Sequence, residues 1–261
     1  MWNEGGASRC DLGITLNHSM VLTRKVPLAL GLDKTMVREH LRWEVEQSLV
    51  SPLSEYLMDY QRLPFSSSAG HPVYLLVLLR KLIISQIQSL FQTMGVSLVD
   101  VDVDLFALIR LLLAQGGVST DDLVALVDVD AHHLTVVLIY KQDFYLKHVI
   151  ALDTARPHRK NQRLSDITPV LLKELKRLVF GHRLGGDLNA LAHIVITGEG
   201  ASSTFQEAVA EQTVVPVALL DPFSSLKILP SVADLSKSKK LARHCGPAVG
   251  LALKHAALHL Q

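Results

Sequence analysis

The sequence is poor in cysteine, in aromatic residues and in net charge, and each shortage excludes a class of protein. Its two cysteines, Cys10 and Cys245, are far apart and form no CxxC pair, which argues against a disulfide scaffold or a zinc ribbon. The formal net charge is +1, so no overall attraction to nucleic acid is expected. Aromatic residues are only 5% of the chain, and the basic segment 156–163 has none, which argues against a nucleic-acid platform.

Long apolar runs are also missing. The longest, 73–79, ends at Arg80-Lys81 and is far shorter than the roughly 20 residues that a membrane span needs. The first residues lack the basic and apolar regions of a secretory signal. We therefore expect a cytoplasmic protein that does not insert into a membrane itself.

What the sequence has is enough apolar material for a core, with 49% hydrophobic and 20% charged residues. Apolar periodicity and turn residues predict an α+β unit in the first hundred residues, in the order β, α, β, β, α, β. Asp33 is expected to cap its first helix, whose inward stripe is Val37, Leu41, Val45 and Leu49. The predicted segments are strands at 13–17 and 19–27, a helix at 33–50, strands at 55–63 and 73–79, a helix at 80–94, a strand at 96–101 and a helix at 104–113.

The second part of the chain is organised around a polar loop between β-rich runs. The runs 123–128, 134–140 and 144–152 predict three strands, and the first two meet at the loop from Asp128 to Thr135. Downstream we expect a helix at 167–180 with the core face Ile167, Leu171, Leu175 and Leu178, a strand at 192–197, a helix at 202–212, a strand at 215–220, and a last helix beginning at Gly246-Pro247.

Seven motifs follow one another along the chain: Arg42-Trp43-Glu44-Val45-Glu46-Gln47, Asp59-Tyr60-Gln61, Val101-Asp102-Val103-Asp104-Leu105-Phe106-Ala107-Leu108, the loop from Asp128 to Thr135, Lys173-Glu174-Leu175-Lys176-Arg177, Thr197-Gly198-Glu199-Gly200-Ala201 and Ala248-Val249-Gly250-Leu251-Ala252-Leu253. Together they resemble the type IV pilus assembly proteins of the PilM family, relatives of the division protein FtsA in the actin-like superfamily. Each motif is weak alone, and their order and spacing carry the resemblance.

The resemblance implies an α/β, actin-like (ribonuclease H-like) fold of two lobes with an FtsA-type extra α+β subdomain. It assigns residues 1–102 to that subdomain with a remnant of the first lobe, 103–123 and 244–261 to helices of the first lobe, and 124–243 to the second lobe. The family's first half-lobe, with its first phosphate loop, is expected to be missing, so that the fold is N-terminally truncated. Asp11-Leu12-Gly13 imitates that loop, but His18 stands where Lys belongs, and an ordinary strand entry is the alternative. A partner subunit that completes the first lobe is a further hypothesis.

The resemblance also implies a nucleotide site, which would hold ATP with Mg²⁺, in a degenerate form. Phosphate loops need glycine because backbone N–H groups reach the oxygens only where no side chain intervenes. Here Asp130 and Glu199 stand at glycine positions. The implied nucleotide-binding residues are Asp128, Asp130, Thr135, Glu174, Arg177, Gly198, Glu199, Gly200 and Ala201; no catalytic or metal-ligating residue is assigned. A Rossmann turn at Gly198-Glu199-Gly200 is disfavoured by Ser203 at the third glycine position, and a tight strand-to-helix turn is the simpler interpretation.

For a partner, the resemblance implies the cytoplasmic tail of an inner-membrane pilus or secretion protein, PilN-like, which would bring the protein to the inner membrane. Trp43, Glu44 and Gln47 are the candidate contact residues, although Trp43 fits packing at the helix rim equally well. Two functions therefore remain: a scaffold that grips this tail, or an active actin-like ATPase that drives pilus assembly.

Overall fold

The computed structural model describes residues 11–152, 160–224, 226–227 and 239–258. The chain divides into two compact units, unit 1 up to Asp104 and unit 2 from Leu105 onwards, and each is described by itself. None of the helices in the described part combines the length and hydropathy that crossing a lipid bilayer requires.

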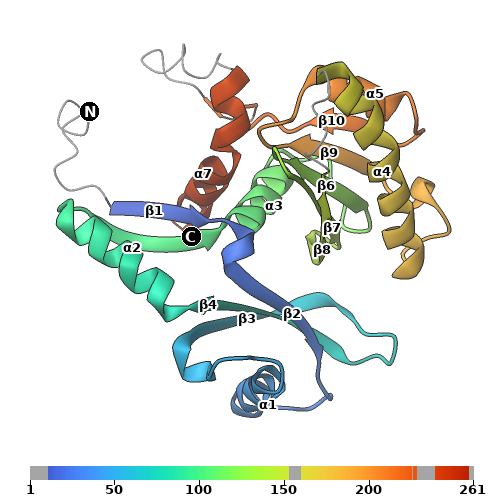
Figure 1. The fold of residues 1–261 in the computed structure, drawn as a ribbon. Helices are drawn as coiled ribbons and strands as arrows, with labels where there is room; N and C mark the ends of the chain where they lie inside the picture. Colours follow the sequence, from blue (N-terminus) through green and yellow to red (C-terminus); the bar gives the residue numbers. More distant parts are fainter. Residues whose placement is uncertain (1–10, 153–159, 225, 228–238, 259–261) are drawn as a thin grey trace. The chain divides into compact units, whose positions relative to one another are not determined.

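Unit 1 contains a three-stranded antiparallel sheet with the order β2-β4-β3, formed by β2 (Val21–Pro27), β4 (Pro72–Arg80) and β3 (Tyr56–Ser66). Helix α1 (Lys34–Glu46) packs on it (Figure 1). The Asp33 side chain caps α1 by accepting a hydrogen bond from the backbone N–H of Met36 at 2.8 Å. Val37, Leu41 and Val45 are buried, as the periodicity predicts, so this helix is held by its apolar stripe.

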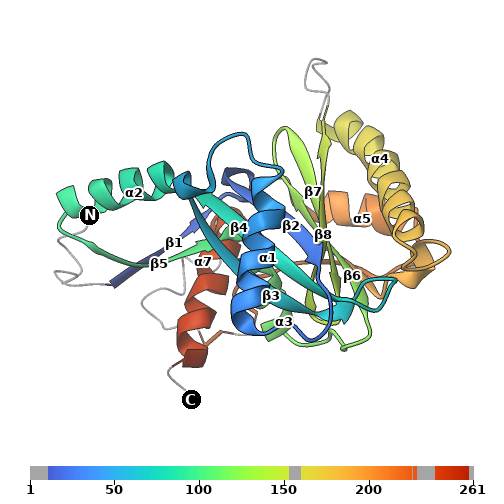
Figure 2. The same ribbon diagram turned by 90° about the horizontal axis from the view of Figure 1, so that it is seen from below.

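The other sheet of unit 1 has two parallel strands, β1 (Asp11–Leu16) and β5 (Ser97–Val103). Helix α2 (Lys81–Thr93) connects β4 to β5, and Figure 2 shows it beside the two strands. Asp11-Leu12-Gly13 lies within β1 and pairs with β5, which supports an ordinary strand rather than a phosphate loop.

Unit 2 is built on a five-stranded mixed sheet with the order β10-β9-β6-β7-β8. The strands β6 (Leu123–Val129), β7 (His133–Tyr140) and β8 (Asp143–Ala151) form an antiparallel meander. The strands β9 (His193–Thr197) and β10 (Val217–Leu219) continue it in parallel to β6. The ends of β6 and β9 therefore meet at one edge, next to the loop that leads into β7.

Helices cover both faces of this sheet (Figure 1). Helices α4 (Lys160–Gly181) and α5 (Ser203–Ala210) bury their apolar sides in one core with alternate residues of the strands. Helix α3 (Asp104–Ala114) and helix α7 (Lys239–Leu258) pack together on the opposite side, where a Cβ atom at Gly250 would overlap the carbonyl oxygen of Ala107. Short 3-10 helices are η2 (His18–Met20), η3 (Leu53–Glu55) and η4 (Leu188–Ala190).

Two predicted helix starts are wrong. α4 begins at Lys160 instead of 167 and contains Pro169, and α7 begins at Lys239 with Pro247 inside it rather than at its start. A proline inside a helix removes one backbone hydrogen bond, and the helix continues where the flanking residues favour it. The notably basic segment 156–163, which was expected to form a loop, is helical from Lys160 to Arg163, while 156–159 lies outside the described residues.

The predicted domain limits differ slightly from the compact units. The boundary was expected after residue 102, and the compact units divide after Asp104. Unit 2 includes α7 and also α3 from Leu105 onwards. The assignment of α3 and α7 to a first lobe stays a prediction.

Candidate functional site

The two predicted phosphate-side residues, Asp128 and Thr135, lie directly opposite each other in the β6–β7 ladder. Asp128 is also the partner of Thr197 on β9, and Thr135 is the partner of Val149 on β8. Residues paired directly across strands project to the same face of a sheet. These four residues therefore form one row at the end of the sheet, on the face opposite to the core made with α4 and α5.

Asp130 occupies the glycine position of the hairpin and binds the loop's own backbone. Its Oδ1 atom accepts hydrogen bonds from the N–H groups of His132 at 2.5 Å and His133 at 2.7 Å. Its own N–H donates to the carbonyl oxygen of His133 at 3.0 Å. Two N–H donors of the kind that a phosphate loop offers to an anion are thus already satisfied by a carboxylate of the same chain.

The electrostatics of Asp130 agree with this arrangement. Partial burial acts to raise the pKa of the Asp130 carboxyl, but the two backbone N–H bonds and the neighbouring His133 ring outweigh it and hold the pKa below its usual range. The side chain remains about half exposed, with Oδ2 3.6 Å from Nδ1 of His133. The carboxylate is therefore charged at neutral pH, and it adds negative charge at the tip of the hairpin.

The loop Gly198-Glu199-Gly200 lies tightly against the end of β6. Gly198 has φ +93°, and a Cβ atom on it would overlap the Oδ1 atom of Asp128 and lie 2.7 Å from the backbone of Val129. A Cβ atom on Gly200 would lie 2.6 Å from Cγ1 of Val129, and the Gly200 N–H donates to the carbonyl oxygen of Val129 at 2.8 Å. Both glycines are thus required by close packing of the loop on β6, which favours a tight strand-to-helix turn.

The other members of this predicted loop differ in exposure. Glu199 is exposed, whereas Ala201 is buried in the core formed with α4 and α5. Ser202 caps α5, since its hydroxyl oxygen accepts a hydrogen bond from the N–H of Phe205 at 3.2 Å. Ala201 is therefore a packing residue, and Glu199 presents a second carboxylate to solvent where the family pattern has glycine.

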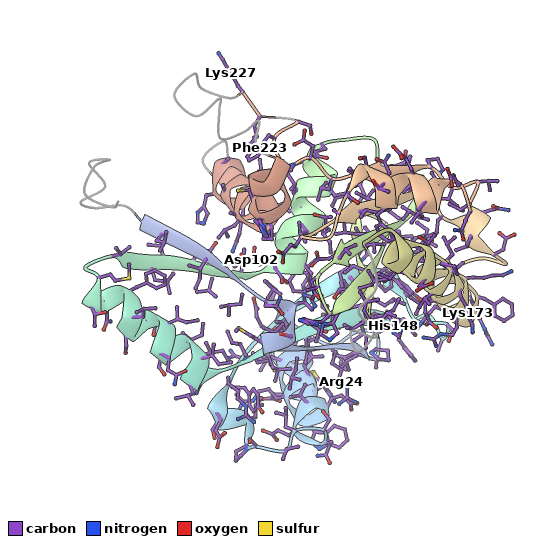
Figure 3. The ribbon with its side chains drawn as sticks, turned by 45° about the horizontal axis from the view of Figure 1, so that its top comes forward. Arg24, Asp102, His148, Lys173, Phe223 and Lys227 are labelled. Carbon is purple, nitrogen blue, oxygen red and sulfur yellow. The ribbon has the colours of Figure 1, made fainter. Side chains whose placement is uncertain are left out.

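Glu174 and Arg177 lie together on α4, above β8. The Oε2 atom of Glu174 accepts a hydrogen bond from Nε of Arg177 at 2.7 Å and lies 3.3 Å from Nε2 of His148 on β8. Figure 3 labels His148 together with Lys173, the residue that precedes Glu174. The hydrogen bond from Arg177 is the main cause that lowers the pKa of Glu174, and the charges of Arg177, His148 and Lys173 add to it.

This cluster lies on the other face of the sheet from Asp128. His148 pairs with Val136, and Val136 pairs with Val127, which is in the core formed with α4 and α5. The predicted nucleotide-binding set is therefore divided: Asp128, Thr135 and Gly198 are brought together, whereas Glu174 and Arg177 lie across the sheet. His148 was not predicted, although its spacing of two from Ile150 places it on the α4 face.

Among the residues that the structure describes, no group of three or more His, Cys, Asp or Glu side chains is arranged to hold a metal ion. Asp128, near the end of β6, has its Oδ1 atom against Gly198. Asp130 and Glu199 place carboxylates on the two loops that the resemblance assigns to a nucleotide. The carboxylate of Asp130 therefore binds backbone N–H groups of its own hairpin.

The predicted partner residues lie on the outer side of α1 in unit 1. Trp43 is 60% exposed, and Gln47 is exposed at the C-terminal end of the helix. The Oε1 atom of Glu44 instead accepts a hydrogen bond from Nη2 of Arg24 on β2 at 2.9 Å. Trp43 is thus presented to solvent rather than packed at the rim, and Glu44 ties α1 to the sheet.

Comparison with known proteins extends this description. Residues 1–148 match the family described as type IV pilus assembly protein PilM. A solved PilM-PilN type IV pilus biogenesis complex is similar with a TM-score of 0.69 and 18% identity, over 93% of this chain and 78% of that chain. This similarity shows that the expected actin-like fold is present.

More distant similarities have TM-scores below 0.5. One is a protein of Bacteroides thetaiotaomicron with an actin-like ATPase fold, with a TM-score of 0.44 and 12% identity over 81% of this chain and 69% of that chain. Another is the cytoplasmic domain of EpsL, an inner-membrane component of the Vibrio cholerae type II secretion system, with a TM-score of 0.42 and 13% identity over 74% of this chain and 63% of that chain. The family match over residues 1–148 covers more than half of this chain, so this chain belongs to the type IV pilus assembly protein PilM family.

Proposed function

We propose that this protein is a scaffold of a type IV pilus or related secretion machine. It binds the N-terminal cytoplasmic tail of a PilN-like inner-membrane protein, and through that partner it associates peripherally with the inner membrane. Its nucleotide site is degenerate, so that holding another protein, rather than hydrolysing ATP, is its task.

The observation that carries the proposal is the self-bonded hairpin. Asp130 uses one carboxylate oxygen to satisfy the N–H groups of His132 and His133, at 2.5 and 2.7 Å. A phosphate would have to displace this carboxylate and then bind beside its charge. Glu199 adds a second exposed carboxylate on the neighbouring loop. Both features disfavour polyphosphate binding, because like charges repel and the donors are taken.

The partner side of the proposal is supported by the similarity to a PilM-PilN complex and by the surface of α1. Trp43 exposes 60% of its area, on the side of α1 opposite to the buried stripe. Exposed tryptophan is enriched among residues that dominate binding energy. Gln47, one turn further along the helix, can supply a polar contact, while Glu44 keeps α1 fixed through Arg24.

Isothermal titration with a peptide copying the N-terminal tail of the PilN-like protein tests this proposal. We expect saturable binding that weakens at least about tenfold in Trp43→Ala, because a central aromatic anchor contributes about 2 kcal/mol or more. The matched control is Phe180→Ala, which removes another exposed aromatic side chain (70% exposed) from α4. Absence of binding by the unaltered protein at about 1 mM peptide contradicts the proposal.

The alternative, an active ATPase, is favoured by one observation: Asp128 and Thr135 lie side by side next to the Gly198 loop. Thermal unfolding with Mg-ATP separates the two functions, since a ligand that binds only the folded state raises Tm. The scaffold proposal expects no shift. A clear Tm increase that disappears in Asp128→Ala supports the enzyme.

A further inference from the structure

Helix α4 has a second side, which faces outward on unit 2 (Figure 1). The side toward the sheet is the buried stripe Leu171, Leu175 and Leu178. The exposed residues of α4 repeat every three or four positions, so they lie along one side of the helix, opposite to that stripe. We call this strip the outer face of α4. It runs from Asp166 to Phe180 and includes Val170, Lys173, Lys176 and Arg177.

The outer face combines positive charge with exposed apolar side chains. Phe180 is 70% exposed and Val170 is 43% exposed. Between them along the helix stand three exposed cations, Lys173, Lys176 and Arg177. An aromatic ring beside long cationic side chains is typical of surfaces that bind at a boundary between polar and apolar material.

Negative charge lies at the margins of this face. Asp166 is at its N-terminal end, two turns before Lys173. The side chain of Glu174 is only 21% exposed and contacts His148 on β8. Helix α5, which shares the core with α4, has one glutamate and neither lysine nor arginine, and the net charge of the whole chain is only +1. Positive charge is therefore concentrated on the outer face of α4.

The end of α4 adds a cation at a position that glycine normally occupies. The N–H of Leu184 donates to the carbonyl oxygen of Val179 at 3.0 Å, and the N–H of Arg183 donates to that of Phe180 at 3.0 Å. This is the hydrogen-bond pattern of a left-handed helix cap, and Arg183 holds it with φ +56°. Arginine is less favourable than glycine in this conformation, but it places a guanidinium group one turn beyond Phe180.

The β7–β8 turn brings a further cation to the same end of unit 2. The ring of Tyr145 lies 6.2 Å from that of Tyr140 and 6.0 Å from that of His182, so the turn lies beside the end of α4. Lys141, in the turn, has its Nζ atom 5.7 Å from the Tyr140 ring. The carboxylate of the turn, Asp143, is half-buried and accepts a hydrogen bond from the backbone of β8. Lys141, His182 and Arg183 form what we call the basic corner.

We propose that the outer face of α4 and the basic corner bind the surface of an anionic lipid bilayer. The lysine and arginine side chains contact the phosphate groups, and Phe180 reaches the boundary between headgroups and acyl chains. Clustered cations with an aromatic residue are the composition of surfaces that bind anionic membranes from one side.

The form of the surface favours a bilayer over a protein segment. A helix packed on a sheet presents a ridge, which a flat and deformable headgroup layer can follow, whereas a peptide needs a groove or a strand edge. An acidic protein surface would satisfy the cations but would bury Phe180 against charge. The nearly neutral chain gains from such a patch only at short range, within a Debye length of the membrane.

Co-sedimentation of the full chain with vesicles containing about 30% phosphatidylglycerol, at about 0.1 M salt, tests the proposal. We expect the partition coefficient to fall at least about tenfold in Lys173→Glu/Lys176→Glu, and likewise with vesicles of phosphatidylcholine alone, because cations near an anionic surface supply most of the attraction. The matched control is Lys34→Glu/Arg38→Glu, which changes the net charge equally at exposed positions of α1 and should bind like the unaltered protein.

Phe180 distinguishes a lipid surface from another anionic partner. Phe180→Ala should bind the anionic vesicles at least about threefold more weakly, because the ring is no longer removed from water. The same variant should bind polyglutamate as weakly as the unaltered protein does. In Phe180→Trp, bromine atoms on the acyl chains should quench the fluorescence that the new tryptophan adds.

Three results overturn the proposal: no binding to anionic vesicles, an equal loss in the α1 control pair, or no quenching in Phe180→Trp. Polyglutamate binding as tight as vesicle binding also overturns it and assigns the face to an acidic protein. The membrane contact does not rest on the tail-binding function proposed above, since the chain is tested without the tail. Trp43→Ala should keep its vesicle binding, so the two proposals fail separately.

Discussion

The carboxylate of Asp104 accepts a hydrogen bond from the backbone N–H of His18 at 3.0 Å and lies 3.2 Å from Nδ1 of the same residue. Both side chains are nearly buried, with exposed fractions of 10% and 13%. Asn17 adds a third bond to the same carboxylate at 3.1 Å. Asp104 thus joins the end of β5 to the segment between β1 and β2.

We expect Asp104→Ala to lower the free energy of unfolding of unit 1 by about 1–3 kcal/mol, because the substitution removes the carboxylate that accepts from the His18 N–H and from Asn17 and lies against Nδ1 of His18. Urea denaturation followed by tryptophan fluorescence measures this, since Trp43 lies in unit 1. Asp121→Ala, at an exposed position of unit 2, is the control and should change stability little. Equal stability of Asp104→Ala and the unaltered protein would contradict this assignment.

Gly198 and Gly116 allow the effect of crowding to be separated from that of backbone conformation. Both have positive φ, +93° and +76°, but only a Cβ atom at Gly198 meets neighbouring atoms. We expect Gly198→Ala to cost about 2–4 kcal/mol and Gly116→Ala about 1 kcal/mol, because the first adds overlap with Asp128 and Val129 to the left-handed backbone penalty. Thermal or urea unfolding of both variants measures the difference. Similar losses in the two would show that Gly198 is needed for φ alone.

Asp130 should make stability depend on pH in the acidic range. Its pKa is lowered on folding, so its contribution is fully present above the unfolded pKa, near 4, and is lost as the pH falls through the lower folded value. At neutral pH we expect Asp130→Ala to cost about 1 kcal/mol, because two backbone N–H groups lose their acceptor. The difference between the two proteins should shrink as the pH falls below about 4. A difference that is independent of pH would mean that the carboxylate does not hold the hairpin.

Glu174 provides a test of the cluster on α4. Since the hydrogen bond from Arg177 is the main cause of its lowered pKa, Arg177→Gln should raise that pKa towards the usual range for a glutamate. The control is Lys176→Gln, which removes an exposed positive charge next to Arg177 in the sequence and should change the pKa of Glu174 less. Carboxyl carbon chemical shifts recorded during an acid titration measure both. The effect on stability should be small, because exposed ion pairs contribute little.

Much of the fold was predictable from local signals. The cap at Asp33, the stripe Val37, Leu41 and Val45 of α1 and the stripe of α4 follow from local signals, and the structure confirms them; α1 ends at Glu46, so the predicted fourth member, Leu49, lies beyond it and is only partly buried. The starts of α4 and α7 were not predictable. The sequence rule treats proline as a helix start, while Pro247 lies inside α7, and α4 begins at Lys160, ahead of the predicted start at 167. Whether flanking residues outweigh one lost hydrogen bond is decided by packing along the whole helix.

The candidate site was predictable only in part. The substitution at Asp130 was visible, but its capture of the two N–H groups that follow is a turn geometry that the sequence merely permits. The separation of Glu174 from Asp128 depends on strand register. The β7–β8 ladder shifts register between Leu138 and Ile139, so the face on which His148 lies cannot be obtained by counting along the hairpin from its turn.

The close contact of α3 with α7 has a consequence for synthesis of the chain. Arg110 donates a hydrogen bond to the carbonyl oxygen of Gly250 at 2.8 Å, so α3, the first helix of unit 2, is completed by a helix whose contact residue follows 140 positions later in the chain. The β2-β4-β3 sheet closes within a much shorter stretch of sequence. During translation, the β2-β4-β3 sheet can form early, whereas unit 2 cannot complete its fold until α7 has been synthesised. Until then unit 2 exposes apolar surface that chaperones bind.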